Sequence, residues 1–502
     1  MKNSTKIIVF LSILTTSIGF SQMQPCNGSG FAGSFPCNDY DLMSNMSILS
    51  VTGISGAEGS DVWGWTDPLD GKEYALFATT HSTAFVDVSD PVSPVLLGRI
   101  DTETTNNVWR DVKVYNNYAF IVADNVGAHG MQVFDLTKLR DGIDSDLTYT
   151  LADNDYSVFT GIGSCHNIVI NESEGMAYVV GCNSASGGPV FIDISNPSSP
   201  NIVGSYATDG YTHDAQVVTY NGPDNSPDPM TTSEPTYVGR EILIASNGSF
   251  GGSDKLVIVD VTDKNAPFNI GDVAYSQPGY AHQGWFTDDH RYFIMGDETD
   301  EQSFGMNTRT LVFDLSDLDN PVLHSTYSGP SAAIDHNGYV KGNEYFMANY
   351  RAGMRVLNIP TLLSANNTNS EVGYFDTYPD DDNTAFNGAW SIYPYFTSGN
   401  ILISDIERGL FVVRKSGTLS TNDVTLDNTF TMSPNPASQN PTISSKSNQK
   451  INTIEVYNIL GQKTFSEDNI NLQEYVLPTD NFTNGIYLIK INSTITKKLI
   501  LK

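Results

Sequence analysis

The chain has 502 residues, a formal net charge of -31 and only four cysteines. A length of this order exceeds one ordinary hydrophobic core, so we expect two or more domains. A chain this acidic repels polyanions, which argues against nucleic acid as a partner and leaves cations, basic proteins and neutral glycans.

Residues 1–21 have the pattern of a secretory signal peptide. Lys2 and Lys6 precede an apolar run from Ile7 to Phe20 that is too short to cross a bilayer and is followed by small or polar residues. Cleavage there would deliver the protein to an exported compartment, where disulfides form. Later segments lack the length and hydropathy of a membrane span, so we expect no transmembrane segment in the mature protein.

The four cysteines predict two disulfides. Cys26 and Cys37 bracket a Gly- and Ser-rich loop in the N-terminal segment, residues 22–46, and a bridge between them would hold this segment in place. Cys165 and Cys182 flank two adjacent predicted strands, which is compatible with the geometry of a second bridge. Free buried thiols are the alternative, and the lack of a CxxC pair argues against a cysteine-based zinc site.

A short phrase recurs along the middle of the chain. It reads TAFVDVSDPVSPVLLGRI at 83–100, PVFIDISNPSSPNIVGSY at 189–206, KLVIVDVTDKNAPFNIGDVAY at 255–275 and TLVFDLSDLDNPVLHSTY at 310–327, with weaker copies at 131–139, 354–362 and 410–417. Copies at a spacing of about 50 residues predict a unit of four short strands repeated around an axis. We therefore expect an all-β, seven-bladed β-propeller over residues 47–415, with a six-bladed ring as the alternative.

The last repeat lacks a fourth strand before the polar linker at 416–429. Residues 47–51 precede the first inner strand and resemble the fourth strands of the other repeats. We predict that this N-terminal strand completes the last blade, because a closed ring leaves no exposed sheet edge.

Residues 430–502 differ in composition, and their short strand patterns and Asn-Gly and Leu-Gly turns predict a small β-sandwich. The segments SPNP at 433–436, VYNILGQ at 456–462, NGIYL at 484–488 and KKLILK at 497–502 occur there in order. With these segments the tail resembles the type IX secretion C-terminal sorting domain. The resemblance implies the type IX secretion machinery as a partner and a protein that is secreted or attached to the outer surface.

The body also contains LVIVD at 256–260. Over roughly residues 25–415 it resembles the choice-of-anchor B family, whose propellers consist of LVIVD-type repeats. The resemblance implies a surface or secreted propeller and no particular reaction.

The inner strands of six repeats open with side chains that can bind a ligand. Four of the eight histidines stand at this position, and two aspartates stand there in the first repeats: His166, His213, His282, His336, Asp61 and Asp111. The second strands end in further polar residues that we predict on the same face, including Asp124, Asp297, Glu298, Arg351, Asp405 and Glu407. These residues predict a polar, His-rich mouth of the central channel.

Imidazoles that converge on one mouth can bind a divalent metal such as zinc, so the four histidines are the predicted metal ligands. Only neighbouring histidines could share one ion, because opposite blades are too far apart. The acidic run 380–383 offers oxygen ligands for calcium, or it is a solvated loop. Alternatively, each histidine is structural and bonds the backbone of the neighbouring blade.

Five tryptophans in or beside the inner strands either stack on a sugar or pack between blades: Trp63, Trp65, Trp109, Trp285 and Trp390. These features favour a binding or interaction scaffold for a glycan, peptide or protein over an enzyme. A metal-dependent hydrolase or lyase at the mouth is the second hypothesis, and a purely structural adhesion element is the third. The sequence has no Gly-x-Ser-x-Gly, phosphate-loop or HExxH motif, so we name no catalytic residue and expect no nucleotide cofactor.

Overall fold

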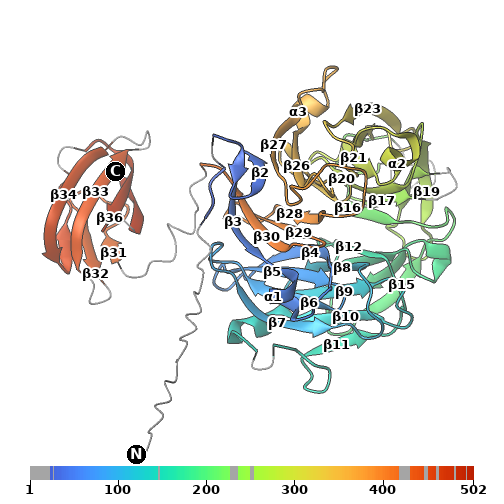
Figure 1. Cartoon of the computed structure of the whole chain (residues 1–502), viewed down its shortest axis with the longest axis horizontal. Helices are drawn as coiled ribbons and strands as arrows, with labels where there is room; N and C mark the ends of the chain where they lie inside the picture. The colour runs from blue at the N-terminus through green and yellow to red at the C-terminus, as the bar shows by residue number, and fades with distance from the viewer. Residues whose placement is uncertain are drawn as a thin grey trace, which may run out of the picture. The chain divides into compact units, whose positions relative to one another are not determined.

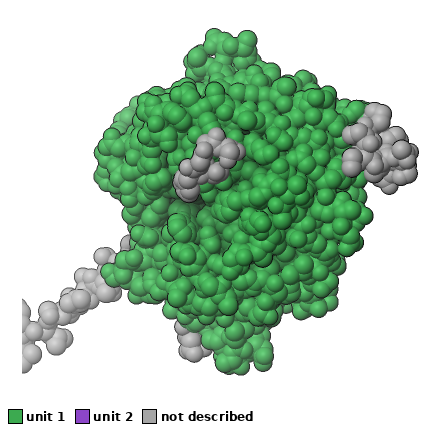
Figure 2. All heavy atoms as spheres, turned by 90° about the vertical axis from the view of Figure 1, so that its right-hand side faces the viewer, with its two compact units in different colours: residues 1–393, 402–413 green, residues 394–401, 414–502 purple. Residues whose placement is uncertain are grey.

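A computed structural model describes residues 23–26, 28–144, 147–226, 236–248, 254–417, 430–445, 450–458, 463–479, 482–492 and 495–502. The predicted signal peptide and most of the predicted linker lie outside these ranges. Within them, no helix is both long and apolar enough to cross a membrane. The chain divides into two compact units, residues 1–393 with 402–413 and residues 394–401 with 414–502. Figure 2 shows one face of the first unit in green.

The body consists of antiparallel sheets whose strands follow one another along the chain (Figure 1). The first two sheets are β4 (Gly59–Thr66), β5 (Glu73–Thr79), β6 (Ser82–Asp87) and β7 (Val95–Asp101), then β8 (Arg110–Tyr115), β9 (Tyr118–Ala123), β10 (Met131–Asp135) and β11 (Tyr156–Phe159). The next two are β12 (Asn167–Asn171), β13 (Met176–Val180), β14 (Val190–Asp193) and β15 (Asn201–Ser205), then β16 (Asp214–Thr219), β17 (Glu241–Asn247), β18 (Lys255–Asp260) and β19 (Phe268–Ala274).

The fifth sheet is β20 (Ala281–Phe286), β21 (Tyr292–Asp297), β22 (Arg309–Asp314) and β23 (Val322–Ser328). The sixth is β24 (Gly338–Lys341), β25 (Glu344–Ala348), β26 (Met354–Asn358) and β27 (Glu371–Phe375), extended by β2 (Phe35–Asn38) and β1 (Phe31–Ala32). The last is β28 (Ala389–Tyr393), β29 (Asn400–Asp405), β30 (Gly409–Lys415) and β3 (Tyr40–Met46). Short helices follow some strands: α1 (Ile48–Thr52), α2 (Asp300–Phe304), α3 (Ile359–Leu362), and the 3-10 turns Leu136–Asp141 and Ala185–Gly187.

The inner strands form a closed circle. Each one contacts the next in the series β4, β8, β12, β16, β20, β24 and β28, and β28 contacts β4. Figure 1 shows several of them gathered near the middle of the unit. Apolar side chains of neighbouring sheets pack together, for example Tyr178 and Phe191 of one sheet with Leu243 and Val257 of the next. The all-β propeller predicted from the repeats is therefore confirmed.

In the four blades with a strong copy, the recurring phrase forms the third and fourth strands. These strands lose register by a bulge at equivalent places, including Phe191/Ile192 and Ile258/Val259. A glycine of the fourth strand lies beside each of these two bulges, and an added Cβ at Gly204 would lie 2.0 Å from the carbonyl oxygen of Lys264. The glycine is required because the following repeat's turn passes directly over it.

The N-terminus closes the ring, but by a different segment from the one predicted. The closing strand is β3, next to β30, and the Asn45 side chain donates to the carbonyl oxygen of Leu410. The predicted strand at 47–51 is wrong, because Ser47 caps the N-terminus of α1 by accepting from the Ser50 amide and Gly53 ends α1 in the left-handed region. The predicted start of the propeller at residue 47 is therefore too late.

Both predicted disulfides are present, between Cys26 and Cys37 and between Cys165 and Cys182. Cys37 lies on β2, which pairs with β27, so the first bridge ties the N-terminal segment to the sixth sheet. None of the four cysteines is free.

The C-terminal unit contains two sheets that share one apolar core. One comprises β31 (Phe430–Ser433), β32 (Thr442–Ser445) and β35 (Glu474–Val476), and the other comprises β34 (Lys463–Leu472), β33 (Ile451–Asn458), β36 (Gly485–Ile491) and β37 (Ile495–Leu501). Phe430 and Ile443 of the first sheet pack with Ile454, Ile489 and Leu499 of the second. This arrangement is the expected β-sandwich.

Candidate functional site

Four histidines of consecutive blades lie side by side at the start of their inner strands. His166, His213 and His336 directly precede or flank β12, β16 and β24, and His282 is the second residue of β20. The ring centroids are 4.4 Å apart for His166 and His213, 4.2 Å for His213 and His282, and 4.2 Å for His282 and His336. The repeat therefore places one imidazole per blade in a continuous row, which we call the histidine row.

A cavity of about 640 Å³ opens over the histidine row. Its wall combines aromatic and acidic side chains: Trp109, Tyr211, Tyr280, Tyr350, Phe386, Trp390, Glu58, Asp124, Glu298 and Glu407. Trp109 and Phe386 are 41% and 45% exposed. The volume falls within the range of about 300–1,000 Å³ that is usual for small-molecule sites.

Backbone carbonyls orient two of the imidazoles. His213 Nδ1 lies 3.0 Å from the carbonyl oxygen of His282, and His336 Nδ1 lies 2.6 Å from that of Trp390. A carbonyl only accepts, so Nδ1 carries the hydrogen in both rings and Nε2 keeps its lone pair. These two histidines bond the neighbouring blade, as the structural alternative requires, while Nε2 stays available for a ligand.

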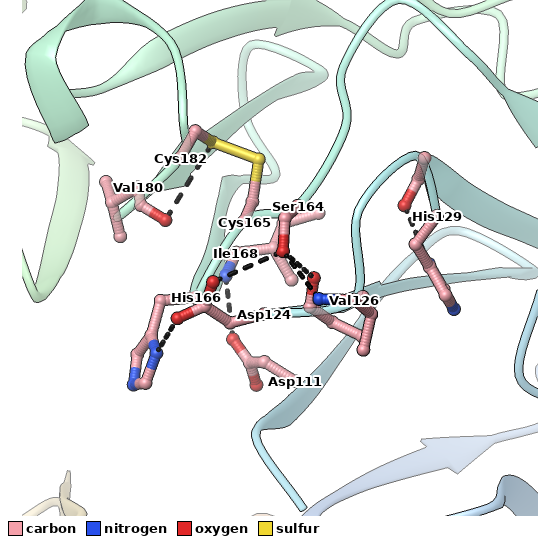
Figure 3. The surroundings of a disulfide bond; sticks show 12 residues. Asp111, Asp124, Val126, His129, Ser164, Cys165, His166, Ile168, Val180 and Cys182 are labelled. Carbon is pink, nitrogen blue, oxygen red and sulfur yellow. Dashed lines mark hydrogen bonds and ion pairs between the residues drawn. A yellow bond between two sulfur atoms is a disulfide. The ribbon is translucent and has the colours of Figure 1, made fainter. Parts of the chain in front are cut away.

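The other two histidines of the row, His166 and His282, have different partners. His166 Nδ1 lies 2.9 Å from Asp124 Oδ2, a contact visible in Figure 3. Nδ1 of His282 is buried and has no hydrogen-bond partner among the residues that the structure describes. The row therefore contains imidazoles in three distinct settings rather than four copies of one inter-blade bond.

Glu298 faces two members of the row. Its Oε2 lies 3.7 Å from Nε2 of His282 and its Oε1 lies 3.6 Å from Nε2 of His336, while Tyr350 Oη donates to Oε1 at 2.8 Å. Burial raises the pKa of Glu298 to about 7. Burial also holds the pKa of His282 well below its usual range and lowers that of His336 to about 3, so both rings are neutral near pH 7.

Tyr350 holds this carboxylate from a strained backbone position. Its φ is 31°, in the left-handed region that non-glycine residues rarely adopt. Its carbonyl oxygen accepts from the amides of Gly353 and Ala389, which fixes the turn between β25 and β26 against β28. The same residue presents its phenol to Glu298.

The aspartates that open the first two inner strands have another environment. Lys113 Nζ lies 3.0 Å from Asp61 Oδ2 and 2.5 Å from Asp111 Oδ1, and all three side chains are buried. Asp111 also accepts from the amide of Ile168 at 2.7 Å. Burial raises the pKa of Asp61 to about 8. Neither aspartate lines the large cavity, and we call these three residues the lysine–aspartate cluster.

Three other predicted residues do not line the cavity. Asp297 accepts from Tyr275 Oη and from the amides of Gly279 and Tyr280. Arg351 binds Asn387 and Asp381. Asp405 accepts from the amides of Glu407 and Arg408. Glu298 and Glu407, which stand in the turns after β21 and β29, line the cavity, whereas Asp297 and Asp405 at the ends of these strands do not.

Two carboxylates of the acidic run 380–383, which the sequence offers as calcium ligands, form ion pairs with arginines. Asp381 lies 2.7 Å from Arg351 Nη1, and Asp380 lies 2.9 Å from Arg408 Nη2. Asp381 also accepts from the amide of Asn383. The run is therefore a surface loop whose carboxylates are held by ion pairs and a backbone hydrogen bond.

The disulfide between Cys165 and Cys182 lies directly beside the histidine row (Figure 3). It joins the residue before His166 to Cys182, which stands two residues after β13 of the same blade. Ser164 Oγ donates to Asp124 Oδ1 at 3.3 Å, so the same segment positions the carboxylate that bonds His166. The bridge therefore fixes one end of the row.

Sequence reasoning missed most of the aromatic wall. Two of its members, Tyr211 and Tyr280, stand two residues before His213 and His282. A recurring Tyr-x-His at the start of an inner strand was therefore the available signal. Tyr350 comes from the turn between β25 and β26, Phe386 comes from the loop before β28, and neither carries such a pattern.

Comparison with known families finds two modules. Residues 73–102, 109–127 and 163–208 match the LVIVD repeat, and residues 431–502 match the secretion system C-terminal sorting domain. The chain thus carries LVIVD repeats in its propeller and a sorting domain of the type IX secretion system at its end, which marks it for export to the cell surface or the extracellular space. No curated protein is similar to it in sequence.

Solved structures with a similar fold include the β-propeller domain of Cps50 (Swd1) from Myceliophteria thermophila. It is 11% identical, with a TM-score of 0.45, and the match covers 72% of this chain and 98% of that chain. A functionally unknown protein from Desulfotomaculum acetoxidans DSM 771 is also 11% identical, with a TM-score of 0.43 and coverage of 65% and 87%.

Proposed function

We propose that this exported propeller is an extracellular binding protein that holds a sugar unit of a neutral glycan in the cavity over the histidine row. The observation that carries the proposal is the cavity wall, which contains both aromatic rings and carboxylates. Aromatic rings pack on the apolar face of a sugar, and carboxylates accept hydrogen bonds from its hydroxyl groups.

Charge supports a neutral ligand over an anionic one. Glu58, Asp124, Glu298 and Glu407 all line the cavity, and the whole chain carries a net charge of -31. An anionic ligand would meet repulsion both at a distance and on contact. Trp109 and Phe386 are the exposed aromatic residues of the wall, so they are the expected stacking surfaces.

The test is a glycan array probed with the purified exported protein, followed by calorimetry with the best oligosaccharide. Phe386→Ala should weaken binding about fivefold to tenfold, as expected for the loss of one aromatic contact. Phe304→Ala is the matched control, because Phe304 is 44% exposed and lies outside the cavity wall. The proposal fails if no neutral glycan binds, or if both variants weaken binding equally.

A further inference from the structure

We propose that His282, His336 and Glu298 form a binding site for one divalent transition metal ion of the zinc type at the floor of the cavity. Among the described residues, one nitrogen of each histidine and one oxygen of Glu298 all lie within 4.8 Å of one another. The proposed site contains two of the four histidines that the sequence predicts as metal ligands, and it adds a carboxylate.

The distances between the donor atoms suit a shared metal ion better than direct hydrogen bonds. The two N···O distances are 3.7 Å and 3.6 Å, which exceed the 2.7–3.2 Å of an N–H···O hydrogen bond. Two ligands that each lie about 2.0–2.1 Å from a tetrahedral zinc ion are about 3.4 Å apart. Small side-chain rotations would therefore bring all three donor atoms to coordination distance.

The donor atoms are also prepared by their second partners. His336 Nδ1 donates to the carbonyl oxygen of Trp390, which leaves the Nε2 lone pair directed at Glu298. Tyr350 Oη holds one oxygen of Glu298. Metal-bound histidines and carboxylates in proteins are oriented by second contacts of this kind. His336 can therefore form the inter-blade bond through Nδ1 and bind the metal ion through Nε2.

Nδ1 of His282 is the buried atom that a purely structural account leaves unexplained. It has no hydrogen-bond partner among the described residues, and its ring is 2% exposed. A histidine whose only role is an inter-blade bond would use this atom as His213 and His336 do. The ring is instead oriented with its other nitrogen, Nε2, toward Glu298, where the two atoms can share an ion.

Two histidines and one glutamate leave a fourth position on a tetrahedral ion, and the three donors line the large cavity. That position would take water or an oxygen atom of a bound ligand. This last step rests on the proposed function, whereas metal binding itself does not.

The test is a titration of EDTA-treated, dialysed exported protein with cobalt(II), followed by its visible absorption, and then displacement by zinc. One equivalent of cobalt should give the intense bands of a tetrahedral site. His336→Ala and Glu298→Gln should each weaken cobalt binding at least tenfold. His324→Ala is the control, because His324 bonds only the carbonyl oxygen of Leu363 in another part of the propeller.

Glu298→Gln keeps the shape of the side chain, so it decides the outcome if His336→Ala does not fold. Absence of bands in the unmodified protein, or equal binding by Glu298→Gln and the unmodified protein, would overturn the metal site. Phe386→Ala should bind cobalt normally. Loss of glycan binding with normal cobalt binding therefore identifies a failure in the sugar contacts and not in the metal site.

Discussion

The histidine row and the lysine–aspartate cluster both lie at the start of the inner strands, one residue apart in the repeat, and their chemistry differs. Asp111 accepts from the amide of Ile168 in the next blade just as Gln283, the residue after His282, accepts from the amide of Gly338. In the cluster, Lys113 pairs with both Asp61 and Asp111 in a buried setting. In the row, His282 and His336 face Glu298 at distances too long for hydrogen bonds, on the floor of a large cavity. The start of the inner strand thus serves the fold in the first blades and faces a cavity in the later ones.

The difference lies in what the neighbouring blade contributes. The second inner strand contributes Lys113, which pairs with both aspartates, and the amide of Ile168 in the third donates to Asp111. The later strands contribute backbone carbonyls, which orient an imidazole without satisfying its second nitrogen. The recurrence of a polar residue around a propeller therefore does not show whether that residue has a structural role. Its role depends on the partner of each of its polar atoms.

The largest expected effect comes from Lys113→Met. It leaves two buried carboxylates without their cation, and removing one partner of a buried ion pair costs about 3–5 kcal/mol. Chemical denaturation should show this loss in the free energy of unfolding. The cobalt stoichiometry of the folded fraction should not change. A decrease of less than about 1 kcal/mol in the free energy of unfolding would contradict the structural role of the cluster.

The double variant Cys165→Ser, Cys182→Ser should lower the free energy of unfolding by about 3 kcal/mol, because the bridge closes a loop of this length in the unfolded chain. The matched comparison is Cys26→Ser, Cys37→Ser, whose loop is shorter. Only the first pair lies beside His166, so only its removal should also alter ligand affinity. Equal effects of the two pairs on affinity would argue against a role of the bridge in positioning the row.

Asp61→Asn should make stability less dependent on pH. Burial raises the pKa of Asp61 to about 8 in the folded protein, above its ordinary value of 3.8 in the unfolded chain. Its contribution is therefore fully present below pH 3.8 and is lost as the pH rises through 8, by at most about 1.4 kcal/mol per pH unit. Thermal unfolding between pH 5 and 8 should show a flatter profile for Asp61→Asn, and parallel profiles would contradict this reasoning.

His213→Ala should have the smallest effect. It removes one hydrogen bond to the carbonyl oxygen of His282, worth about 1 kcal/mol of stability. Cobalt affinity should stay within about threefold of the unmodified protein, because His213 is not one of the three donors. A tenfold loss of cobalt affinity would place His213 among the ligands and restore the wider site expected from the sequence.

Much of the fold was predictable because the repeated phrase encodes both strands and turns, and the tail carries its own motifs. The closing strand was misplaced because Ser47 and Gly53 are helix-capping residues whose effect outweighs the strand-like composition between them. The histidine row followed from repeat alignment alone. Glu298 was expected on the same face, but its contact with His282 and His336 was not, because Asp297 and Glu298 are adjacent and the turn after β21 decides which one faces the cavity.

The most direct test of the metal site is anomalous diffraction from a zinc-soaked crystal, recorded on both sides of the zinc absorption edge. We predict one strong peak about 2.0–2.2 Å from Nε2 of His282, Nε2 of His336 and a carboxylate oxygen of Glu298. A crystal without a peak at these three atoms, or with its main peak between His166 and Asp124, would contradict the assignment.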